Sequence, residues 1–240
     1  MRIDIDTYKE ILDTLTRNKG RTILTGFGVF WGIFMLVALM GSGNGLQDKL
    51  ASNFEGFATN SAMVWAQNTT KPYHGYRKGR SWNMTTRDVE RLKENVSELN
   101  IVTPITFSGT ASLVFGDKKT QGSVKGVEAD YTKVEEPSMS FGRFLNTMDE
   151  VQRRKVCVIG KRIYSSLFPT GGDPCGQLIR VDSTYYEVVG VNVSSGNMNI
   201  GGRADETVYV PMTLMQQVYN LGEDVHLIAM TGKPGVKMSA

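Results

Sequence analysis

The sequence predicts an α+β protein: an N-terminal transmembrane helix continued by a stalk, followed by a mixed α+β extracytoplasmic domain. Three observations predict this class. Every position from Thr22 to Gln47 is uncharged, a run of 26 residues in a chain of which 21% is charged. After the run, short apolar stretches of period two are mixed with stretches of helical period. Basic residues are concentrated on the N-terminal side of the run, an asymmetry that orients membrane helices.

The composition excludes several classes of protein. Lys and Arg number 27 and Asp and Glu 24, and the resulting net charge of +3 is too weak for a dedicated nucleic-acid binder. Two cysteines cannot form a disulfide-dense scaffold or a Cys₄ zinc site, and two histidines offer little for metal binding. We therefore expect no nucleic-acid partner and no metal site. About 190 residues outside the run suffice for one large domain or two small ones.

The uncharged run is long and apolar enough to cross a bilayer. Ten residues between Ile23 and Leu39 are Leu, Ile, Phe or Val, and together they contribute about −3 to −6 kcal/mol to insertion. A cleaved signal peptide is the alternative, with small residues at 41–43 as its cleavage site. However, 21 residues precede the run, and the run itself is too long for a signal peptide. We expect a transmembrane helix over residues 22–46.

Charges beside the run predict its orientation. Five basic residues precede it, and only Lys49 lies between it and Asn68. Cytoplasmic flanks are rich in Lys and Arg. Residues 1–21 are therefore expected in the cytoplasm and residues 47–240 outside. The five preceding residues are Arg2, Lys9, Arg17, Lys19 and Arg21.

The cytoplasmic flank is itself patterned. Apolar residues recur at helical spacing over 8–15, behind a Thr7-x-x-Glu10 capping box. This predicts an amphipathic helix in the membrane interface, which leads into a basic elbow of Arg17, Lys19 and Arg21 at the lipid headgroups. A plain topogenic flank with no further role is the alternative.

Two patterns concern helix packing and the stalk. Gly28 and Gly32 form a G-x-x-x-G pair, which lets a second helix approach closely, although such pairs also arise by chance. A helical stripe continues past the apolar run and predicts a stalk of two or three turns. We expect the stripe to transmit movement from the membrane. Its residues are Leu46, Leu50, Phe54 and Phe57.

The order of the expected elements after residue 60 gives the α+β class. Strands are expected at 61–67, 101–107, 111–115, 122–127, 155–159, 207–210 and 225–231, with a hairpin at 178–191. Helices are expected at 86–99 with Thr86 as the cap, at 161–168 and at 212–221. The polar loops at 68–83 and 194–206 are surfaces where specificity could lie, and solvated connectors are the alternative.

Catalytic chemistry is nearly absent from the sequence. His74 lies in a polar loop, and His226 lies in an expected apolar strand, where a hydrogen-bonded structural role is typical. The sequence has no P-loop, so it does not predict ATP binding of that kind. A disulfide between Cys157 and Cys175 would close a loop of 17 intervening residues, and a buried free thiol at Cys157 is the alternative.

Several short motifs follow one another along the chain. They are Arg17-Asn18-Lys19-x-Arg21-Thr22, Gly43-Asn44-Gly45-Leu46, Gly142-Arg143-Phe144, Val158-Ile159-Gly160, Leu167-Phe168-Pro169, Asp173-Pro174-x-Gly176, Val188-Val189-Gly190-Val191 and Val208-Tyr209-Val210-Pro211. In this order they resemble a known family, the MacB-like periplasmic core domain of bacterial ABC-transporter permeases. It includes macrolide and peptide exporters and lipoprotein-releasing permeases. Cys175 departs from the pattern, since an aliphatic residue is usual there.

Physically, the turn residues in these motifs are expected to be structural. Pro174 and Gly176 predict a tight turn between a helix and a hairpin. Gly160 lets a strand pass into a helix, and Pro211 fits the first turn of the helix that follows. None of the four supplies a nucleophile, a base or a metal ligand.

The resemblance implies a domain of two lobes. One contains strand-helix-strand units near 60–130 and 205–232, and the other is inserted at about 135–204. It also implies a non-catalytic permease subunit in the bacterial inner membrane, in which a partner cytoplasmic ATPase binds ATP and Mg and this chain binds no cofactor. A homodimer or heterodimer of permeases, and a periplasmic adaptor or outer-membrane partner, belong to the same expectation.

In that family three further membrane helices follow the extracytoplasmic domain, so the sequence is expected to be part of a longer permease; a truncated homologue is the alternative. The substrate would be a drug, a peptide or a lipoprotein. A rival function is a single-span anchored binding or sensor module without a transport role. A gene that continues into three more apolar spans beside an ATPase gene would exclude this rival.

Overall fold

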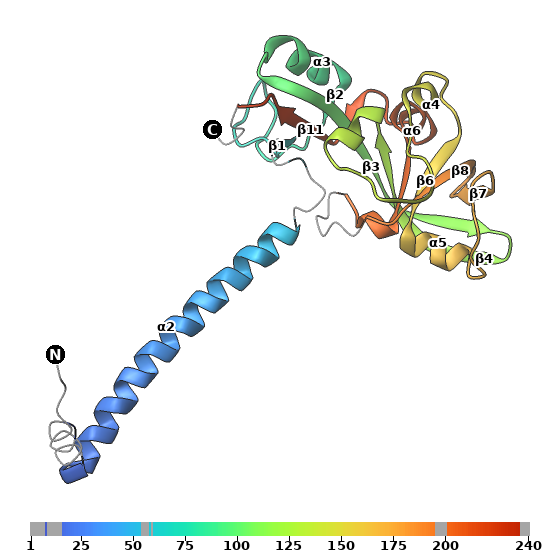
Figure 1. Ribbon diagram of the computed structural model, residues 1–240. Helices are drawn as coiled ribbons and strands as arrows, with labels where there is room; N and C mark the ends of the chain where they lie inside the picture. The colour runs from blue at the N-terminus through green and yellow to red at the C-terminus, as the bar shows by residue number, and fades with distance from the viewer. Residues whose placement is uncertain (1–7, 9–15, 54–57, 59, 195–200, 236–240) are drawn as a thin grey trace. The chain divides into compact units, whose positions relative to one another are not determined.

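The computed structural model describes residues 8, 16–53, 58, 60–194 and 201–235, and its ribbon is drawn in Figure 1. The chain divides into two compact units, Met1–Ser52 and Asn53–Ala240, which are taken in turn. Apart from Tyr8, the amphipathic helix expected over 8–15 lies outside the described residues.

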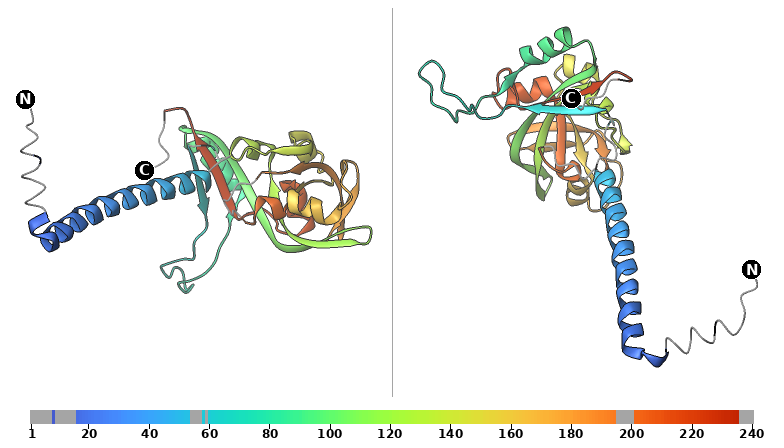
Figure 2. Two further views of the ribbon diagram at one scale, coloured as in Figure 1. Left: turned by 60° about the horizontal axis from the view of Figure 1, so that its bottom comes forward. Right: turned by 90° about the vertical axis from the view of Figure 1, so that its left-hand side faces the viewer.

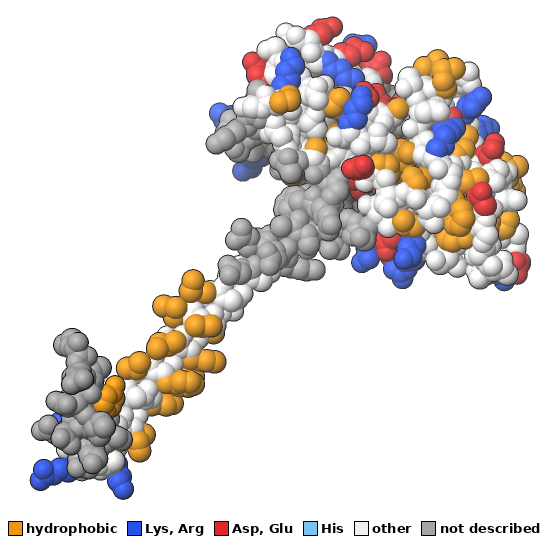
Figure 3. Space-filling model, in the orientation of Figure 1, with side chains coloured by type: hydrophobic (Ala, Val, Ile, Leu, Met, Phe, Trp, Pro, Cys, Tyr) orange, Lys and Arg blue, Asp and Glu red, His pale blue; other side chains and the backbone are white. Residues whose placement is uncertain are grey.

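The first unit is dominated by one long helix, α2 (Lys19–Asn53), of 35 residues. Its stretch Lys19–Gly43 is apolar enough to cross a membrane, and none of it is buried. Large apolar side chains such as Phe27 and Phe34 are exposed along it (Figure 3). A helix that is apolar all round requires a protein core or lipid around it. The helix continues past Gly43 to Asn53, as predicted for a stalk.

The second unit is built on one nine-stranded sheet. Its strand order is β1, β11, β3, β4, β9, β6, β8 and β5, and β7 pairs with both β3 and β8. All pairs are antiparallel except β4 with β9 and β6 with β8. Because β7 returns to β3, six of the strands form a closed ring. The bounds are β1 (Ser61–Trp65), β3 (Leu99–Phe115), β4 (Lys118–Val127), β5 (Met139–Gly142), β6 (Val156–Gly160), β7 (Leu178–Val181), β8 (Thr184–Asn192), β9 (Thr207–Pro211) and β11 (Leu227–Gly232).

One long strand replaces two of the predicted ones. The stretches 101–107 and 111–115 are both part of β3, which runs for 17 residues. The register against β4 shifts between Ser108 and Thr110, so Gly109 is the extra residue of a β-bulge. A glycine between two small polar residues has the composition of a turn, which is why the sequence predicts a break where the strand only bends.

The helices of the second unit are short, and one cap differs from the prediction. The backbone N–H of Thr85 donates to Asp88 Oδ2 at 2.8 Å, so Thr85 and not Thr86 caps the first of them. This helix ends at Asn95 and not at residue 99, because Leu99 already begins β3. The helices are α3 (Thr86–Asn95), α4 (Thr147–Val151), α5 (Lys161–Leu167) and α6 (Met212–Val218), with 3₁₀ helices η1 (Ala129–Lys133) and η2 (Ala204–Glu206) and a two-residue pair β2 (Met84–Thr85) with β10 (Asp224–Val225).

Three clusters of buried apolar side chains hold the second unit together. The largest includes Leu113 and Ile163 and packs α5 and α6 onto the ring of strands. The second packs η1 onto the sheet through Tyr131. The third packs α3 through Val89 against Ile228 of β11. Since each cluster joins helices to the same sheet, the sheet is the frame on which α3, α5, α6 and η1 pack.

Segment 135–204, expected as an inserted lobe, supplies β5, β6, β7 and β8 to this sheet. Its strands are hydrogen-bonded to β9 through β6 and to β3 through β7. The mixed α+β class is confirmed. The boundaries of the lobe, and of the residues 1–21, 22–46 and 47–240 as separate regions, stay predictions.

Candidate functional site

The chain enters the second unit through a small number of backbone hydrogen bonds. Ala58, the first residue described after α2, donates its N–H to the carbonyl of Val134 at 2.9 Å. Two residues later, the carbonyl of Asn60 accepts the N–H of Gly232 at 2.9 Å, and β1 then pairs along β11. Among the described residues, the chain after α2 is therefore hydrogen-bonded to the segment around Val134 and, through β1, to the edge of the sheet.

Beside Val134 lies a buried polar cluster. Lys125 is 2% exposed and Glu135 is 6% exposed. Lys125 Nζ lies 3.4 Å from Tyr131 Oη, and the Tyr131 hydroxyl donates to Glu135 Oε2. The Lys125 ammonium also lies 5.2 Å from the ring centre of Tyr209, within range of a cation–π contact. The cluster attaches the segment 131–135 to β4 and β9, two central strands of the sheet.

Burial controls the protonation of this cluster. It lowers the pKa of Lys125 from 10.5 to about 8, and Glu135 counteracts part of that shift. Burial also raises the pKa of Tyr131 well above 10, and the neighbouring Glu135 adds to this. The tyrosine therefore stays protonated and keeps its proton for Glu135. The cluster has no open path to a substrate, so its chemistry is structural.

A second group of carboxylates lies where η1, α3, α4 and α6 meet. Lys93 Nζ is 3.9 Å from Glu128 Oε2, and Thr213 Oγ1 donates to the backbone carbonyl of Glu150 at 3.1 Å. Burial, and then the charge of Glu128, raise the pKa of Glu150 from 4.5 to about 7. Burial likewise raises the pKa of Glu128. Glu150 therefore changes charge close to neutral pH.

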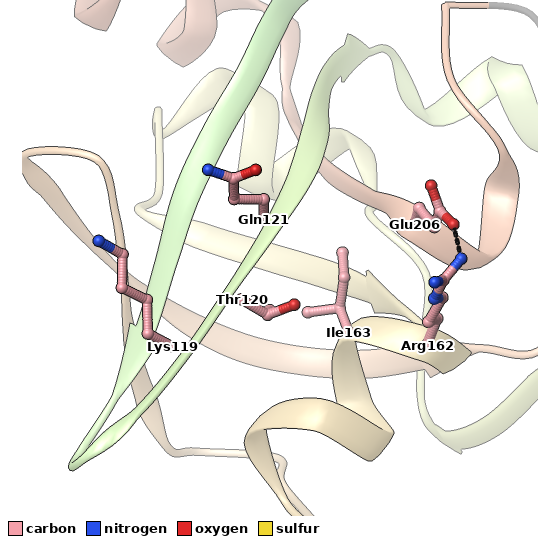
Figure 4. Close-up of a pocket in the computed structure, with 6 residues that line it drawn as sticks. All are labelled: Lys119, Thr120, Gln121, Arg162, Ile163 and Glu206. Carbon is pink, nitrogen blue, oxygen red and sulfur yellow. Dashed lines mark hydrogen bonds and ion pairs between the residues drawn. The ribbon is translucent and has the colours of Figure 1, made fainter.

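A polar pocket of about 320 Å³ opens between β4, α5 and η2. In Figure 4 Arg162 of α5 reaches Glu206 of η2, with which it forms an ion pair, while Lys119 lies away from that pair. Most of the Arg162 side chain is exposed. The pocket holds no nucleophile with an adjacent base, and the pairing of Arg162 leaves little net charge for an anion. Its residues are Lys119, Thr120, Gln121, Arg162, Ile163 and Glu206.

Comparison with known proteins identifies a family with this fold. A family model described as "MacB-like periplasmic core domain" matches residues 22–240. This chain belongs to that family. The match covers both the apolar helix and the whole of the second unit, so the resemblance carried by the short motifs is confirmed.

Curated relatives are macrolide export ATP-binding/permease proteins named MacB. The chain is 24% identical over 216 residues to the one from Psychrobacter arcticus, a match that covers 88% of this chain and 31% of the relative. It is 27% identical to the one from Vibrio parahaemolyticus, again over 88% of this chain and 31% of the relative. The chain thus spans about a third of the length of the curated relatives it matches.

Solved structures of MacB-like domains share the fold. The periplasmic region of MacB from Actinobacillus actinomycetemcomitans matches with a TM-score of 0.62 and 22% identity, over 79% of this chain and 82% of that one. The extracellular domain of YknZ, a noncanonic ABC-type transporter from Gram-positive bacteria, matches with a TM-score of 0.58 and 16% identity, over 72% and 85%. At these identities the likeness concerns the fold.

The residues predicted for helix packing, for the basic elbow and for the stalk lie on α2 or beside it, as far as they are described. Gly28 and Gly32 lie on α2 with no atom within 4 Å of an added Cβ, so one face of the helix is open. A second helix on this face stays a prediction. Arg17, Lys19 and Arg21 are exposed. In the stripe, Leu46 is exposed, the side chain of Leu50 is not described, and Phe54 and Phe57 lie outside the described residues.

Among the turn residues of the MacB-like motifs, Pro174 and Gly176 lie in a tight turn, whereas Pro211 and Gly160 differ from the prediction in position or in reason. Gly176 has φ +84°, and Gln177 N–H donates to the Pro174 carbonyl at 3.1 Å, which closes a tight turn. Pro211 is the cap of α6, one residue before its first turn. Gly160 has ordinary dihedrals, but a Cβ there would lie 2.4 Å from the Ala204 carbonyl. Close approach of η2, and not backbone freedom, requires glycine at 160.

The cysteines and histidines are structural. Cys157 and Cys175 are both free, so the disulfide is not formed. Cys157 lies fully buried in β6; burial raises the pKa of Cys175 to about 11, and an Asp173 carboxylate beside it adds to the shift. His226 accepts a hydrogen bond from Phe107 N–H at 2.9 Å through Nδ1, as expected of a satisfied structural histidine.

Two groups of buried or partly buried charged residues were not predicted from the sequence. Lys125, Tyr131, Glu135 and Tyr209 come from distant parts of the chain, and the only local signal was a lysine among alternating apolar residues of β4. Glu128 and Glu150 carried no signal, since acidic residues near helix starts are common. Within the described ranges, no three His, Cys, Asp or Glu side chains are grouped so that they could hold a metal ion.

Proposed function

We propose that this chain acts in the membrane as a permease of an ABC transporter. In this proposal a partner ATPase hydrolyses ATP in the cytoplasm, and the resulting movement reaches the extracytoplasmic domain through α2. The observation that carries the proposal is an unburied apolar stretch of 25 residues in a chain of the MacB-like family. ATP and Mg would be bound by the ATPase, because the sequence has no P-loop.

The membrane assignment is supported by the energetics of α2. Its apolar stretch has no charged residue between Thr22 and Gln47, and its large side chains have no protein around them. The excess of Lys and Arg before the stretch favours a cytoplasmic N-terminus and an external second unit. Together with the family, this supports the bacterial inner membrane as the proposed site of action.

Coupling would use the entry of the chain into the sheet. Two permease copies, identical or different, would be drawn together when the ATPase closes on ATP, and α2 would move with them. Because Ala58 is bonded to Val134 and β1 to β11, the movement would be delivered to the edge strand β1 and to the segment 131–135, which is attached to the central strands β4 and β9. Such transmission needs an element with two discrete packed arrangements.

The substrate class follows from the relatives. MacB relatives are named for macrolide export, so export of a macrolide-type drug is the first activity to test, with peptides and lipoproteins as the further substrates to examine. A periplasmic adaptor or an outer-membrane partner would complete such a path across the envelope.

The test is a change that uncouples transport from ATP turnover. Ala58→Pro removes the N–H that bonds Val134, and Ala58→Ser keeps it as the matched control. In vesicles that contain the full protein and its ATPase, we expect Ala58→Pro to lower drug transport several-fold while ATP hydrolysis continues. Equal transport by both variants would reject the coupling route, and absence of any ATP-dependent transport by the unchanged protein would reject the permease function.

A further inference from the structure

The segment that joins β1 to β2 is a well-defined hairpin of unusual composition. Between Glu55 and Asp88 the sequence has no acidic residue, but it has five basic ones: Lys71, Arg77, Lys78, Arg80 and Arg87. In both views of Figure 2 this segment stands away from the body of the domain. It is called the 67–82 hairpin below. A segment that only connects two strands through solvent does not require an excess of basic over acidic residues.

The 67–82 hairpin is held by its own hydrogen bonds. Tyr73 and Tyr76 exchange backbone N–H···O bonds of 3.2 and 2.9 Å. The two residues between them, His74 and Gly75, have φ of +45° and +81°, as a tight two-residue hairpin turn requires. Near the base, Thr69 N–H donates to the Arg80 carbonyl at 3.0 Å. The tip is therefore a preformed shape.

The side chains of the hairpin face solvent. Tyr73 is 74% exposed, Tyr76 61% and Trp82 49%. Arg80 stacks over the Tyr76 ring at 4.6 Å. The nine ion pairs found in the described part of the chain include none of the four basic side chains of the hairpin. Exposed tyrosines and uncompensated cations thus lie together on one projection.

We infer that the 67–82 hairpin docks on the surface of an anionic lipid bilayer. Tyrosine and tryptophan favour the headgroup layer, where the ring meets apolar carbon and the polar atom meets water. Clustered Lys and Arg are attracted to anionic headgroups. The aromatic rings and the basic side chains of the hairpin therefore suit, respectively, the boundary with the apolar chains and the anionic headgroups of the bilayer.

A lipid surface fits this hairpin better than a protein does. A stable protein interface buries about 800 Å² on each partner with matching shape, whereas a two-stranded tip offers a narrow convex surface. A fluid headgroup layer needs no matching shape. The hairpin is also tethered to the proposed membrane helix, since only 17 residues separate Gly43 of α2 from Ser61 of β1, and such tethering raises the effective concentration of the hairpin at the membrane.

Of the proposed function, this inference uses only the insertion of α2, not transport. Docking would give the external domain a second attachment to the membrane besides α2. The hairpin continues from β1, the edge strand that also receives the chain from α2. The orientation of that edge against the bilayer would then depend on the lipid composition.

The experiment places a nitrobenzoxadiazole fluorophore on the hairpin of the full chain. The label is attached at Thr70→Cys in a Cys175→Ser background, because Cys157 is fully buried. A second protein carries the label at Thr170→Cys, an exposed position elsewhere in the domain. Each is reconstituted into vesicles of phosphatidylcholine, with or without phosphatidylglycerol, and quenching by spin-labelled lipid is measured. Flotation of the vesicles verifies the insertion of α2 separately.

We expect the label at 70 to be quenched in vesicles with phosphatidylglycerol and the label at 170 to remain in water. The double variant Lys71→Glu with Lys78→Glu should lower the ratio of docked to free hairpin by a factor of about thirty or more. Lys118→Glu with Lys119→Glu, on the exposed β3–β4 hairpin, should leave the ratio unchanged. High salt should weaken docking in the same sense as the first pair.

Three results would overturn the inference while leaving the proposed function intact. The first is a label at 70 that stays in water although the protein floats with the vesicles. The second is quenching that survives the Lys71→Glu, Lys78→Glu pair. The third is quenching that appears only at high protein density, because a second protein copy and not lipid would then cover the hairpin.

Discussion

Lys125 and Glu135 are joined through one buried hydroxyl, that of Tyr131, which lies 3.4 Å from the Lys125 ammonium and donates to the Glu135 carboxylate. Lys125 is in β4, and Glu135 follows η1 by two residues. The pair therefore fastens the segment that receives the Ala58 N–H to the middle of the sheet. A buried charge is tolerated there because an opposite charge and a hydrogen bond accompany it.

Breaking this pair should destabilise the domain strongly. Lys125→Met leaves the Glu135 carboxylate buried without the opposite charge that lies across the Tyr131 hydroxyl, and an uncompensated buried charge costs about 3 to 5 kcal/mol. The measurement is the free energy of urea unfolding of the domain within the full chain in detergent. Glu135→Gln should destabilise for the same reason, and the double variant should cost less than the two single changes together.

The matched control for Lys125 is Lys93, whose ion pair with Glu128 at 3.9 Å is partly exposed. Lys93→Met should cost at most about 1 kcal/mol, since exposed pairs are screened by water. If Lys125→Met cost no more than Lys93→Met, the buried cluster could not be what fastens the 131–135 segment to the sheet.

Glu150 should make stability depend on pH near neutrality. Burial, followed by the charge of Glu128, raises its pKa from 4.5 to about 7. An acid whose pKa is higher in the folded state binds more protons when folded, so stability falls as the pH rises from about 4.5 to about 7. After allowance for its partial exposure, the loss should be about 1 to 2 kcal/mol.

The variant Glu150→Gln should remove that loss. It should be more stable than the unchanged protein at pH 8, and the difference should shrink as the pH is lowered to 5, in unfolding experiments at both values. Glu90→Gln, on the exposed surface of α3, is the control and should not change the pH profile. A Glu150→Gln protein whose stability relative to the unchanged protein is the same at both pH values would contradict the assignment.

The sequence predicted features that depend on neighbouring residues, and it did not predict features that depend on contacts between distant parts of the chain. The apolar run, the turn at Pro174 and Gly176, and most of the strands and helices are local, so composition and periodicity predicted them, whereas β5 and α4 were not predicted. The continuity of β3 across Gly109 depends on pairing with β4, which no local pattern contains. The same is true of Lys125 and Glu135, which meet only because Tyr131 is folded back onto β4.

The reason for a glycine was also non-local at position 160. From the sequence, the glycine at 160 was explained by the change from strand to helix. In the structure the dihedrals of Gly160 suit any residue. The steric constraint comes from the backbone of η2, more than 40 residues later in the chain. Likewise, the sequence predicts only a polar loop for the 67–82 hairpin. Its backbone hydrogen bonds and its pair of exposed tyrosines are features of the folded structure. Contacts between distant segments, not local preferences, decide these cases.

Gly160→Ala should therefore be costly. An added Cβ would lie 2.4 Å from the Ala204 carbonyl oxygen and 2.5 Å from Asp205 backbone atoms, and backbone cannot move aside as a side-chain tip can. Overpacking of this kind costs about 1 to 3 kcal/mol, to be measured as a lower unfolding midpoint. The matched change is Gly109→Ala, which meets no atom within 4 Å and should leave the midpoint nearly unchanged. Equal midpoints for the two variants would contradict the close approach of η2.

The glycine pair of α2 gives the last prediction, which tests the membrane-embedded part of the proposed coupling. Gly28 and Gly32 are one turn apart on a single face, while Gly26 lies on the opposite side of the helix. If a second helix packs on the Gly28 face, Gly28→Leu with Gly32→Leu should separate the helices. A loss of about 1 kcal/mol of packing would lower ATP-driven transport about fivefold. Gly26→Leu should transport normally, and all variants should insert equally by flotation. Normal transport by the double variant would mean that α2 moves without a partner on that face, and coupling would then have to pass through the domain alone.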